Sequence, residues 1–479
     1  MRGGGAHMTR PGERVVVVGS GMAATRFVED LVARGQGHRV TVLGDEPHPP
    51  YNRILLSAVL EGTHPVGALT LREPSWFADH GVDLRLGTRV LQVDRDRRDV
   101  MLVDGTLLPY DRLVLATGSV PTLPPIRGLV HANGRLDDRV HAFRSLDDCF
   151  RLLGSLAGAR RAVVVGGGLL GLQVARALSV RGLLTEIVEG GEHLLRSQVG
   201  RAAGGVLRRD LQRLGTSVYT EARAVRLEEG GPDGALGLRL DNGVTLEADV
   251  VVLAAGGRPS TALARAAGLS TRRGVLVGDG LESVDDPRVH AIGDCAEHAG
   301  RTTGFVPPAW EQARILAAGL CGEPVAYCGT RSVARLRATG LEVAVLGDPE
   351  RTSGEIVEVT NPVLGTHRKL VVRDGVIVAG TFVGDLSRVG LITQYYDRGT
   401  RLAAHEPGSL LMGDRTAPPA RLPDSAEICA CAGVAAGAIR ACDSLDEVQD
   451  RTRATTGCGG CASAVRELLA TRPALTGSG

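Results

Sequence analysis

Four cysteines near the end of the chain lie in two tight pairs, Cys429-Ala-Cys431 and Cys458-Gly-Gly-Cys461. Four thiolates grouped in this way could hold one metal centre, and the glycines beside Cys458 leave backbone N–H groups free to bond cluster sulfides. Three interpretations remain open: a [2Fe–2S] cluster, a structural zinc ion and two disulfides. The narrow first pair favours the cluster, because zinc pairs are usually wider and cytosolic disulfides are rare.

A glycine-rich turn near the N-terminus could bind the phosphates of a dinucleotide. The motif Gly19-Ser-Gly21-Met-Ala-Ala24 follows the apolar run Val15–Val18 and opens a helical pattern over Met22–Ala33. The first glycine permits a tight turn, the second lets the backbone approach a pyrophosphate, and the small third residue allows close packing. The acidic pair Asp45-Glu46 follows the next strand, Arg39–Leu43, where a ribose contact is expected.

A second turn repeats this pattern. Gly166-Gly-Gly168-Leu-Leu-Gly171 follows the apolar run Ala162–Val165 and opens a helical pattern over Leu169–Arg181, and Glu189 closes the next strand. An acidic side chain at that position accepts two ribose hydroxyls and repels a 2′-phosphate. We therefore expect NADH to be preferred over NADPH, although either turn by itself could also be a glycine turn without a ligand.

The elements that must position these motifs form an internal repeat of two β-turn-α-β units. This repeat predicts an α/β fold with two Rossmann-like dinucleotide-binding domains. Apolar alternation around Arg373-Asp374-Gly375 predicts a β-rich C-terminal domain, and short helices carry the cysteine pairs of a small helical domain, for which a [2Fe–2S] cluster is favoured. The expected boundaries are 12–119 plus 253–328 for the first dinucleotide domain, 120–252 for the second, 329–406 for the β-rich domain, 407–425 for a Pro- and Gly-rich linker, and 426–472 for the cluster domain.

The overall composition limits the possible partners. The formal net charge is +1 and only 3% of the residues are aromatic, so neither nucleic acid nor an anionic membrane is an expected partner. Residues 1–14 contain no apolar segment typical of a signal peptide, and no apolar run reaches the roughly 18 residues of a membrane span. We therefore expect a cytoplasmic protein, in which the nine cysteines stay reduced.

Over residues 12–400 the chain resembles the flavoprotein reductases with two dinucleotide-binding domains. In that family the first unit binds FAD and the second binds NAD(P)H. The stretch from Asp45 to Ser57 looks like the family's FAD-contacting segment, and the resemblance assigns Asp45 or Glu46 to the adenosine ribose and Arg53 to the phosphates. Many relatives have a lysine directly after the serine, whereas this chain has Ala58, so one expected flavin contact is missing.

Two later segments carry the same resemblance. Ala116-Thr117-Gly118-Ser119 looks like the family's hinge turn near the flavin, which implicates Thr117 and Gly118 in cofactor binding. Ile292-Gly293-Asp294 resembles its late FAD motif, in which Asp294 would reach the ribityl chain. Residues 12–148 contain no cysteine, so the disulfide or sulfenate chemistry of many relatives is disfavoured beside the flavin.

The end of the chain resembles the bacterioferritin-associated-ferredoxin-like [2Fe–2S] domain. Glu427–Val434 and Thr455–Cys461 carry this likeness, which implies cluster ligation by Cys429, Cys431, Cys458 and Cys461. The gap between the two pairs is somewhat shorter than in that family. Cys442 lies in the gap and is interpreted as a small buried hydrophobic residue rather than a fifth ligand.

The order of motifs resembles the N-terminal part of the assimilatory NADH–nitrite reductase large subunit and the electron-transfer subunit of assimilatory nitrate reductase. The stretches Tyr51–Ser57, Gly293–His298 and Trp310–Ala313 also match that pattern. The resemblance implies hydride transfer from NADH to FAD and one-electron transfer through the cluster to a nitrate or nitrite reductase partner. No ligands for a sirohaem are found, so nitrite reduction by this polypeptide alone is not expected.

This reaction sequence implies no catalytic acid or base, because hydride transfer requires positioning only. The linker is expected to let the cluster domain move between flavin and partner. Two alternatives remain. One is an NADH:ferredoxin or rubredoxin reductase that serves other acceptors, and the other is a non-catalytic redox or iron sensor.

Overall fold

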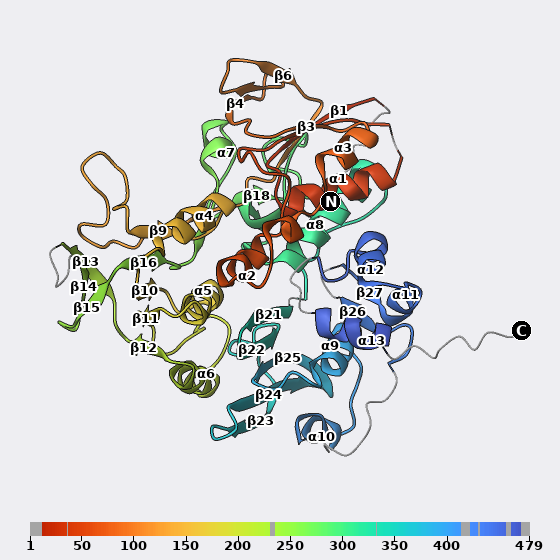
Figure 1. Ribbon diagram of the computed structural model, residues 1–479. Helices are drawn as coiled ribbons and strands as arrows, with labels where there is room; N and C mark the ends of the chain where they lie inside the picture. Colours follow the sequence, from red (N-terminus) through yellow and green to blue (C-terminus); the bar gives the residue numbers. More distant parts are fainter. Residues whose placement is uncertain are drawn as a thin grey trace, which may run out of the picture. The chain divides into compact units, whose positions relative to one another are not determined.

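The computed structural model of this chain describes residues 12–35, 37–229, 235–331, 333–412, 422–429, 432–456 and 461–470 (Figure 1). Its internal contacts divide the chain into two compact units. The first contains Met1–Arg53, Val66–Val120 and Gly257–Thr330, and the second contains Ile54–Pro65, Pro121–Gly256 and Arg331–Gly479. Each unit is therefore assembled from segments that are far apart in the sequence.

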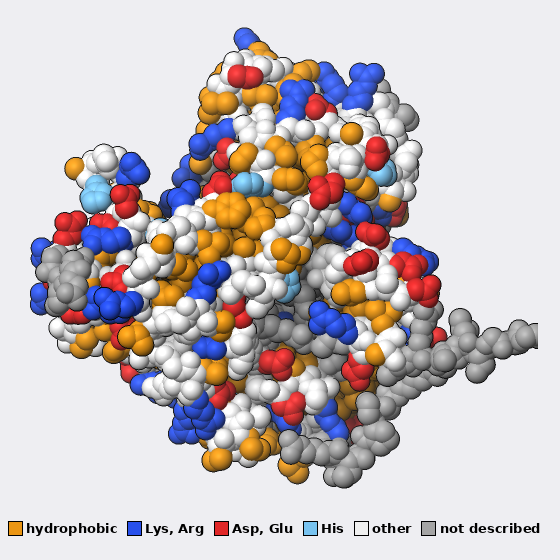
Figure 2. Space-filling view, viewed as in Figure 1, with side chains coloured by type: hydrophobic (Ala, Val, Ile, Leu, Met, Phe, Trp, Pro, Cys, Tyr) orange, Lys and Arg blue, Asp and Glu red, His pale blue; other side chains and the backbone are white. Residues whose placement is uncertain are grey.

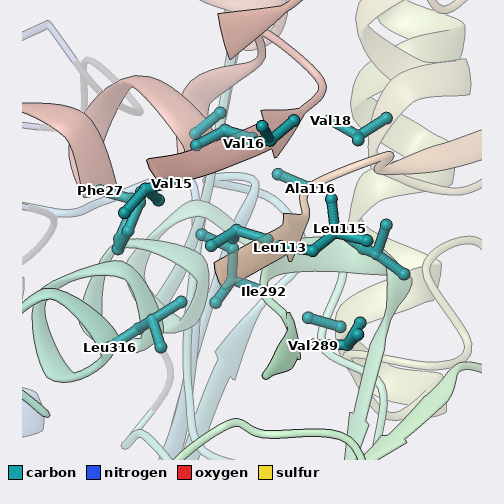
Figure 3. Packing of buried hydrophobic residues seen from close by; sticks show 14 of the residues in the cluster. Val15, Val16, Val18, Phe27, Leu113, Leu115, Ala116, Val289, Ile292 and Leu316 are labelled. Carbon is teal, nitrogen blue, oxygen red and sulfur yellow. The ribbon is translucent and has the colours of Figure 1, made fainter. Parts of the chain in front are cut away.

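The first unit is built on a five-stranded parallel sheet. Its strands, in spatial order, are β19 (Val289–Ala291), β7 (Arg112–Leu115), β1 (Arg14–Val18), β2 (Arg39–Leu43) and β3 (Asp83–Arg85). The strands are rich in valine and leucine because helices cover both faces of a parallel sheet. Side chains of β1, β7 and β19 pack with Phe27 of α1 (Met22–Ala33) and Leu316 of α8 (Val306–Leu320) in one core (Figure 3).

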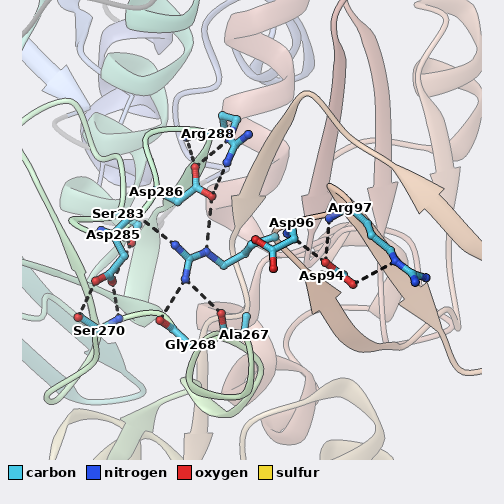
Figure 4. Close-up of polar contacts among 11 residues, drawn as sticks. Asp94, Asp96, Arg97, Ala267, Gly268, Ser270, Ser283, Asp285, Asp286 and Arg288 are labelled. Carbon is cyan, nitrogen blue, oxygen red and sulfur yellow. Dashed lines mark hydrogen bonds and ion pairs between the residues drawn. The ribbon is translucent and has the colours of Figure 1, made fainter.

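A small antiparallel sheet extends the first unit. It contains β4 (Val90–Asp94), β5 (Asp99–Leu102) and β6 (Leu107–Pro109), and Asp104-Gly105 lies in the hairpin between β5 and β6. Arg95 joins this sheet to the segment after α7 (Ala262–Ala266) by donating to the carbonyl oxygens of Gly268 at 3.2 Å and Asp285 at 3.1 Å (Figure 4). The other elements of the unit are α3 (Pro74–Asp79), β17 (Gly257–Pro259), β18 (Val275–Val277) and β20 (Ala296–His298), and β17 pairs with β8 (Ser119–Pro121).

The second unit repeats the parallel sheet, as the sequence predicts. Its strand order is β12 (Thr216–Thr220), β11 (Leu184–Glu189), β10 (Arg161–Val165), β16 (Val250–Leu253) and β9 (Val140–Ala142). Its helices are α2 (Leu56–Glu61), α4 (Leu146–Ser155), α5 (Leu169–Val180) and α6 (Arg201–Arg213), and α2 packs on α5. An antiparallel sheet of β13 (Ala224–Glu228), β14 (Leu236–Leu240) and β15 (Thr245–Ala248) completes this part.

The predicted β-rich region is a five-stranded antiparallel sheet. Its spatial order is β21 (Val333–Ala338), β22 (Leu341–Leu346), β25 (Val376–Val383), β24 (Thr366–Arg373) and β23 (Glu355–Asn361), and Asp374-Gly375 forms the turn between β24 and β25. Helix α9 (Val389–Arg398) packs on this sheet. The sheet has its own core, which includes Phe382 and Ile392.

The beginning of the predicted linker differs from expectation. Residues Glu406–Met412 form helix α10, and its Leu410 and Leu411 join the core of the β-rich sheet. Pro407 lies in the first turn of this helix, where a proline is compatible with helical geometry. A linker was expected from the Pro- and Gly-rich composition, but this part of it forms a short helix. Residues 413–421 of the expected linker lie outside the described residues.

The C-terminal segment contains the short helices that the sequence predicts. They are α11 (Ala436–Arg440), α12 (Leu445–Thr452) and α13 (Ala462–Ala470), together with a strand pair of β26 (Glu427–Cys429) and β27 (Val434–Ala435). The α/β fold class is thus confirmed. Among the described residues, no helix combines the length and apolar character that crossing a membrane requires. Arginine and acidic side chains are interspersed on the face in Figure 2, in keeping with the small net charge.

Candidate dinucleotide and cluster sites

The two glycine-rich turns have nearly the same backbone geometry. Gly19 has φ 114° and donates its N–H to Leu43 O at 2.8 Å, and Gly166 has φ 120° and donates to Val188 O at 2.8 Å. A Cβ atom at Gly19 would overlap Ala116 O, and one at Gly166 would overlap Ala254 O. Both first glycines are therefore required by the fold itself, because the strand end leaves no room for a side chain.

The second glycine of each turn has a different environment. Gly21 and Gly168 begin α1 and α5 with φ of −78° and −79°, which any residue can adopt, and an added Cβ atom would meet nothing within 4 Å. The protein alone does not require glycine at these two positions. Open space beside a helix N-terminus fits a pyrophosphate that approaches the backbone closely.

The third small residue of each motif lies inside the fold. Ala24 is buried in the core of the first unit, and a Cβ atom at Gly171 would overlap the carbonyl oxygen of Gly166. These residues let helix and strand pack closely, as the sequence predicts.

The first turn is bordered by charged side chains. Glu46 accepts a hydrogen bond from the Tyr51 hydroxyl at 2.6 Å and forms an ion pair with Arg53. These three residues line a small pocket together with Ser20 and Gly21 of the turn, whereas Asp45 is exposed and does not line it. Of the two expected ribose contacts, Glu46 is therefore the better placed, and Arg53 lies where a phosphate charge could be balanced.

The late FAD motif lies against the first turn of α1. Gly293 has φ 74°, and a Cβ atom there would come within 3.0 Å of Ala23 Cβ. The Gly293 N–H donates to Gln312 Oε1 at 2.8 Å, and Gln312 is only 1% exposed. Gln312 therefore orients the turn that presents Asp294. The sequence does not predict this role of Gln312, although the residue lies in Trp310–Ala313, a stretch that carries the resemblance.

The hinge turn is joined to the same motif. Ser119 Oγ donates to Asp294 Oδ2 at 2.8 Å. Thr117 donates its hydroxyl to Ser260 O at 2.8 Å, and Gly118 accepts the Ser260 N–H at 2.9 Å. The structure thus brings Thr117, Gly118 and Asp294 together, and it adds Ser119, which the sequence interpretation had not assigned.

The acidic residue at the second turn has two backbone partners. Glu189 accepts the Gly167 N–H at 2.8 Å and the Gly191 N–H at 2.6 Å, and its side chain is 13% exposed. An open pocket of about 580 Å³ begins beside it, lined by Gly190, Gly191, Glu192, His193, Arg196, Glu221, Arg223 and Asp241. The nearest cation, Arg196, has its Nε 3.7 Å from Glu189 Oε1. The carboxylate is held in position and retains acceptor capacity for ribose hydroxyls.

Two of the four expected cluster ligands lie in the described residues. Cys429 ends β26 and Cys461 precedes α13, and both are buried. Cys461 Sγ accepts the Thr455 N–H at 3.2 Å, which suits a sulfur that carries negative charge. Cys431 and Cys458 lie outside the described ranges, within which no group of three or more His, Cys, Asp or Glu side chains could hold a metal ion.

Three of the remaining cysteines, Cys149, Cys295 and Cys442, are buried and fit structural roles. Cys442 is fully buried and donates to Ala438 O at 3.4 Å, in line with its interpretation as a small packed side chain. Cys295 contacts the Leu115 and Ile292 carbonyl oxygens at 3.3 Å, and burial raises the pKa of its thiol. Burial also raises the pKa of Cys149 to about 11. Such thiols are poor nucleophiles at neutral pH.

Comparison with known families identifies both parts of the chain. Residues 13–313 match the pyridine nucleotide-disulphide oxidoreductase family, and residues 427–471 match the BFD-like [2Fe-2S] binding domain. The chain belongs to the pyridine nucleotide-disulphide oxidoreductase family and is an NAD(P)H-dependent oxidoreductase. The two matches imply FAD, NAD(P)H and a [2Fe–2S] cluster as cofactors, which confirms the cofactors expected from the sequence.

Individual proteins similar to this chain are named as reductases or as an electron transfer subunit. The chain is 34% identical over 472 residues to a nitrite reductase [NAD(P)H] of Bacillus subtilis (strain 168), covering 95% of this chain and 57% of that protein. It is 32% identical to the assimilatory nitrate reductase electron transfer subunit of the same organism, covering 95% and 59%. The chain thus spans less than two thirds of the length of these relatives. Among solved structures, the putidaredoxin reductase–putidaredoxin complex matches with a TM-score of 0.75 and 28% identity, covering 85% of this chain and 97% of that one.

Proposed function

We propose that this chain is an NADH-dependent FAD flavoprotein that passes electrons through a [2Fe–2S] cluster to the catalytic subunit of a nitrate or nitrite reductase. The observation that carries the proposal is the presence of two equivalent dinucleotide turns and a cysteine domain on one chain. Similarity along 95% of the chain to a protein named as an electron transfer subunit supports the partner class. The nitrate or nitrite specificity rests on that similarity.

The surroundings of the two turns support different cofactors. FAD would be held by Gly19, Gly21, Ala24, Glu46, Arg53, Thr117, Gly118 and Asp294, with Asp45 at the rim of the pocket. NADH would be held by Gly166, Gly168, Gly171 and Glu189. The Glu189 carboxylate beside the ribose position supports NADH, because a 2′-phosphate there would meet a fixed negative charge.

The cysteines support the direction of electron flow. FAD supplies the exchange between a two-electron hydride and single electrons, and the [2Fe–2S] cluster supplies a one-electron carrier. Residues 12–148 contain no cysteine, and Cys295, which directly follows Asp294, is buried and has a thiol with a raised pKa. These observations argue against a reactive thiol at the flavin, so the C-terminal cysteines Cys429, Cys431, Cys458 and Cys461 are the proposed acceptor site.

The proposed domain limits follow from this assignment. We propose 12–119 plus 253–328 for FAD, 120–252 for NADH, 329–406 for the β-rich domain and 426–472 for the cluster. Helix α10 extends the β-rich domain into the expected 407–425 linker, because Leu410 and Leu411 belong to that domain's core. A shuttling linker would then be confined to the residues after Met412.

An anaerobic titration with NADH tests the proposal. Flavin bleaching and the EPR signal of a reduced [2Fe–2S] cluster are followed together in the reconstituted protein. We expect both in the parent, and we expect Cys461→Ser to keep flavin bleaching and lose the EPR signal. Cys442→Ser is the matched control and should keep both signals. Flavin reduction without any EPR signal in the intact protein would defeat the proposed electron route.

A second candidate function is reduction of a separate small electron carrier. The match to a reductase solved in complex with putidaredoxin covers 97% of that chain, so the flavoprotein part alone resembles such a reductase. Steady-state assays with NADH would separate the two functions. Efficient reduction of a purified ferredoxin by Cys461→Ser would favour the carrier reductase, whereas acceptor reduction that requires Cys461 favours the internal cluster route.

A further inference from the structure

Thr455 has an unusual backbone conformation beside a proposed cluster ligand. Its φ is 70°, in the left-handed region that β-branched residues strongly avoid. The residue is only 8% exposed, and its N–H donates to Cys461 Sγ at 3.2 Å. The strained conformation therefore coincides with an N–H group that is directed at a ligand sulfur.

The side chain of Thr455 is held by the preceding helix. Gln449, on α12, donates from Nε2 to Thr455 Oγ1 at 2.8 Å. The helix ends at Arg453, which has φ 62° and donates its N–H to Gln449 O at 3.0 Å. Gln449 thus contacts the turn through its side chain and through its backbone carbonyl group.

A glycine would adopt φ 70° at position 455 without strain, but it would lack the hydroxyl that Gln449 binds. A strained backbone conformation persists only where surrounding contacts hold the residue in place, and such residues are often found at functional sites. The feature that a threonine adds here is the hydrogen bond between Thr455 Oγ1 and Gln449 Nε2. This bond fixes the direction of the Thr455 N–H group.

The N–H···S hydrogen bond has an electrostatic consequence. Donors to ligand sulfurs stabilise the more negative, reduced form of an iron–sulfur cluster and so raise its reduction potential. Cys461 is 4% exposed, and a hydrogen bond is stronger in such a low-dielectric environment than in water. The orientation of this one N–H group should therefore be visible in the redox properties of the site.

We propose that Gln449 and Thr455 are positioning residues that set the reduction potential of the cluster by directing the Thr455 N–H at Cys461. The proposal rests on cluster ligation by Cys461, as in the proposed function. Neither side chain touches the ligand sulfur itself in the contacts described, so both act through the backbone of the turn.

The test compares four variants of the full chain after cluster reconstitution. Thr455→Val and Gln449→Leu remove the side-chain hydrogen bond, and Thr455→Ser retains it. Thr456→Val is the matched control, because the Thr456 hydroxyl donates to Arg453 O at 2.9 Å in the same turn and is not the group that Gln449 Nε2 binds. The readouts are the cluster midpoint potential, from an EPR-monitored redox titration, and the iron content per chain.

We expect a lower midpoint potential in Thr455→Val and Gln449→Leu, and the parent value in Thr455→Ser and Thr456→Val. If Thr455→Val and Gln449→Leu fail to retain iron while Thr455→Ser and Thr456→Val load normally, the hydrogen bond is required for cluster assembly rather than for the potential, which counts against the proposal. Parent-like potentials and iron contents in Thr455→Val and Gln449→Leu would overturn it, as would a Thr455→Ser variant that behaves like Thr455→Val.

The flavin provides an independent reference. All four variants should bind FAD, and NADH should bleach their flavin as in the parent, because the proposed flavin site lies on other segments of the chain. Absence of a [2Fe–2S] signal in the parent would instead count against cluster ligation in the proposed function. A normal parent signal with unshifted variants counts against the Thr455 assignment alone.

Discussion

Among single residues, we expect Glu189 to influence which nicotinamide cofactor binds. It is held by the Gly167 and Gly191 N–H groups, and Gly191 lines the pocket beside the second turn. We expect Glu189→Gln to raise the ratio of kcat/KM for NADPH to that for NADH. The change should be roughly tenfold or more, since a hydrogen bond to a charged group contributes about 1.5–3 kcal/mol.

The matched control for this prediction lies on the same strand. Glu186 accepts the Tyr219 hydroxyl at 2.9 Å, whereas Glu189 accepts the N–H groups of the glycine-rich turn and of Gly191. Glu186→Gln should leave the NADPH/NADH ratio at the parent value. Steady-state kinetics with both cofactors measure the ratio, and an unchanged ratio in Glu189→Gln would remove the basis for the NADH preference.

A second prediction at this scale concerns His290, which is buried in β19. Burial, followed by the nearby Arg112 guanidinium, lowers the pKa of His290 from 6.5 to about 4. The unfolded chain takes up a proton first as the pH falls below 6.5, so the stability of the folded state decreases between pH 6.5 and about 4. The lowered pKa corresponds to a loss of about 3 kcal/mol at the acidic end of this range.

Denaturant unfolding of the first unit at a series of pH values measures this loss. His290→Gln should flatten the dependence between pH 6.5 and 4, even if its stability at pH 7 is lower. Substitution of the exposed His80, which lies in the same unit, by Gln serves as the control and should keep the parent profile. An equally steep profile in His290→Gln would show that other groups cause the acid sensitivity.

At the scale of elements, two glycines at the start of α5 are expected to have different roles. Gly166 is required by the fold, whereas Gly168 is expected to matter for ligand binding. Gly166 has φ 120° and no room for a Cβ atom, whereas Gly168 has ordinary dihedral angles and open space. We expect Gly168→Ala to keep the parent Tm and to raise the KM for NADH, because the methyl group occupies the space that suits a pyrophosphate. Gly166→Ala should lower the Tm instead, through backbone strain and overlap with Ala254 O.

Thermal unfolding and NADH kinetics distinguish these outcomes. Gly21→Ala provides the control at the equivalent position of α1, where an added Cβ atom also meets open space. It should reduce FAD retention and leave the nicotinamide turn unaltered. A parent-like KM for NADH in Gly168→Ala would argue against pyrophosphate binding at this helix.

Some of these elements could be predicted from the sequence alone, and others could not. The strands β1 and β10 and the helices that follow them were predictable, because apolar runs, glycine spacing and helical periodicity are local signals. The contacts of Asp294 with Ser119 and of Gly293 with Gln312 were not, since they join segments that meet only in the folded chain. Helix α10 was missed because Pro407 and Gly408 suggested a linker, and burial of Leu411 outweighs their low helix propensity.

At the scale of the whole molecule, the two glycine-rich turns belong to parts of the chain with separate hydrophobic cores. One core surrounds β1, β7 and β19 beneath the first turn, a second surrounds β10 and β16, and a third belongs to the β-rich sheet. Three of the stretches with proposed FAD-site residues contribute to the first core, through Ala24, Ala116 and Ile292. FAD should therefore stabilise the first unit by mass action, because it binds the folded state and not the unfolded chain.

The last prediction follows from this coupling. Free FAD at about 100 times its Kd contributes about 2.7 kcal/mol, which for a unit of this size raises the Tm by roughly 5–10 °C. We expect calorimetry of the flavin-depleted protein to show this shift in the transition of the first unit on adding FAD. Gly21→Val is the control: an added Cβ atom at Gly21 meets nothing within 4 Å in the protein, so the variant should fold but respond little to FAD. A full shift in Gly21→Val would mean that FAD binds elsewhere, and the assignment of the two turns would have to be reversed or abandoned.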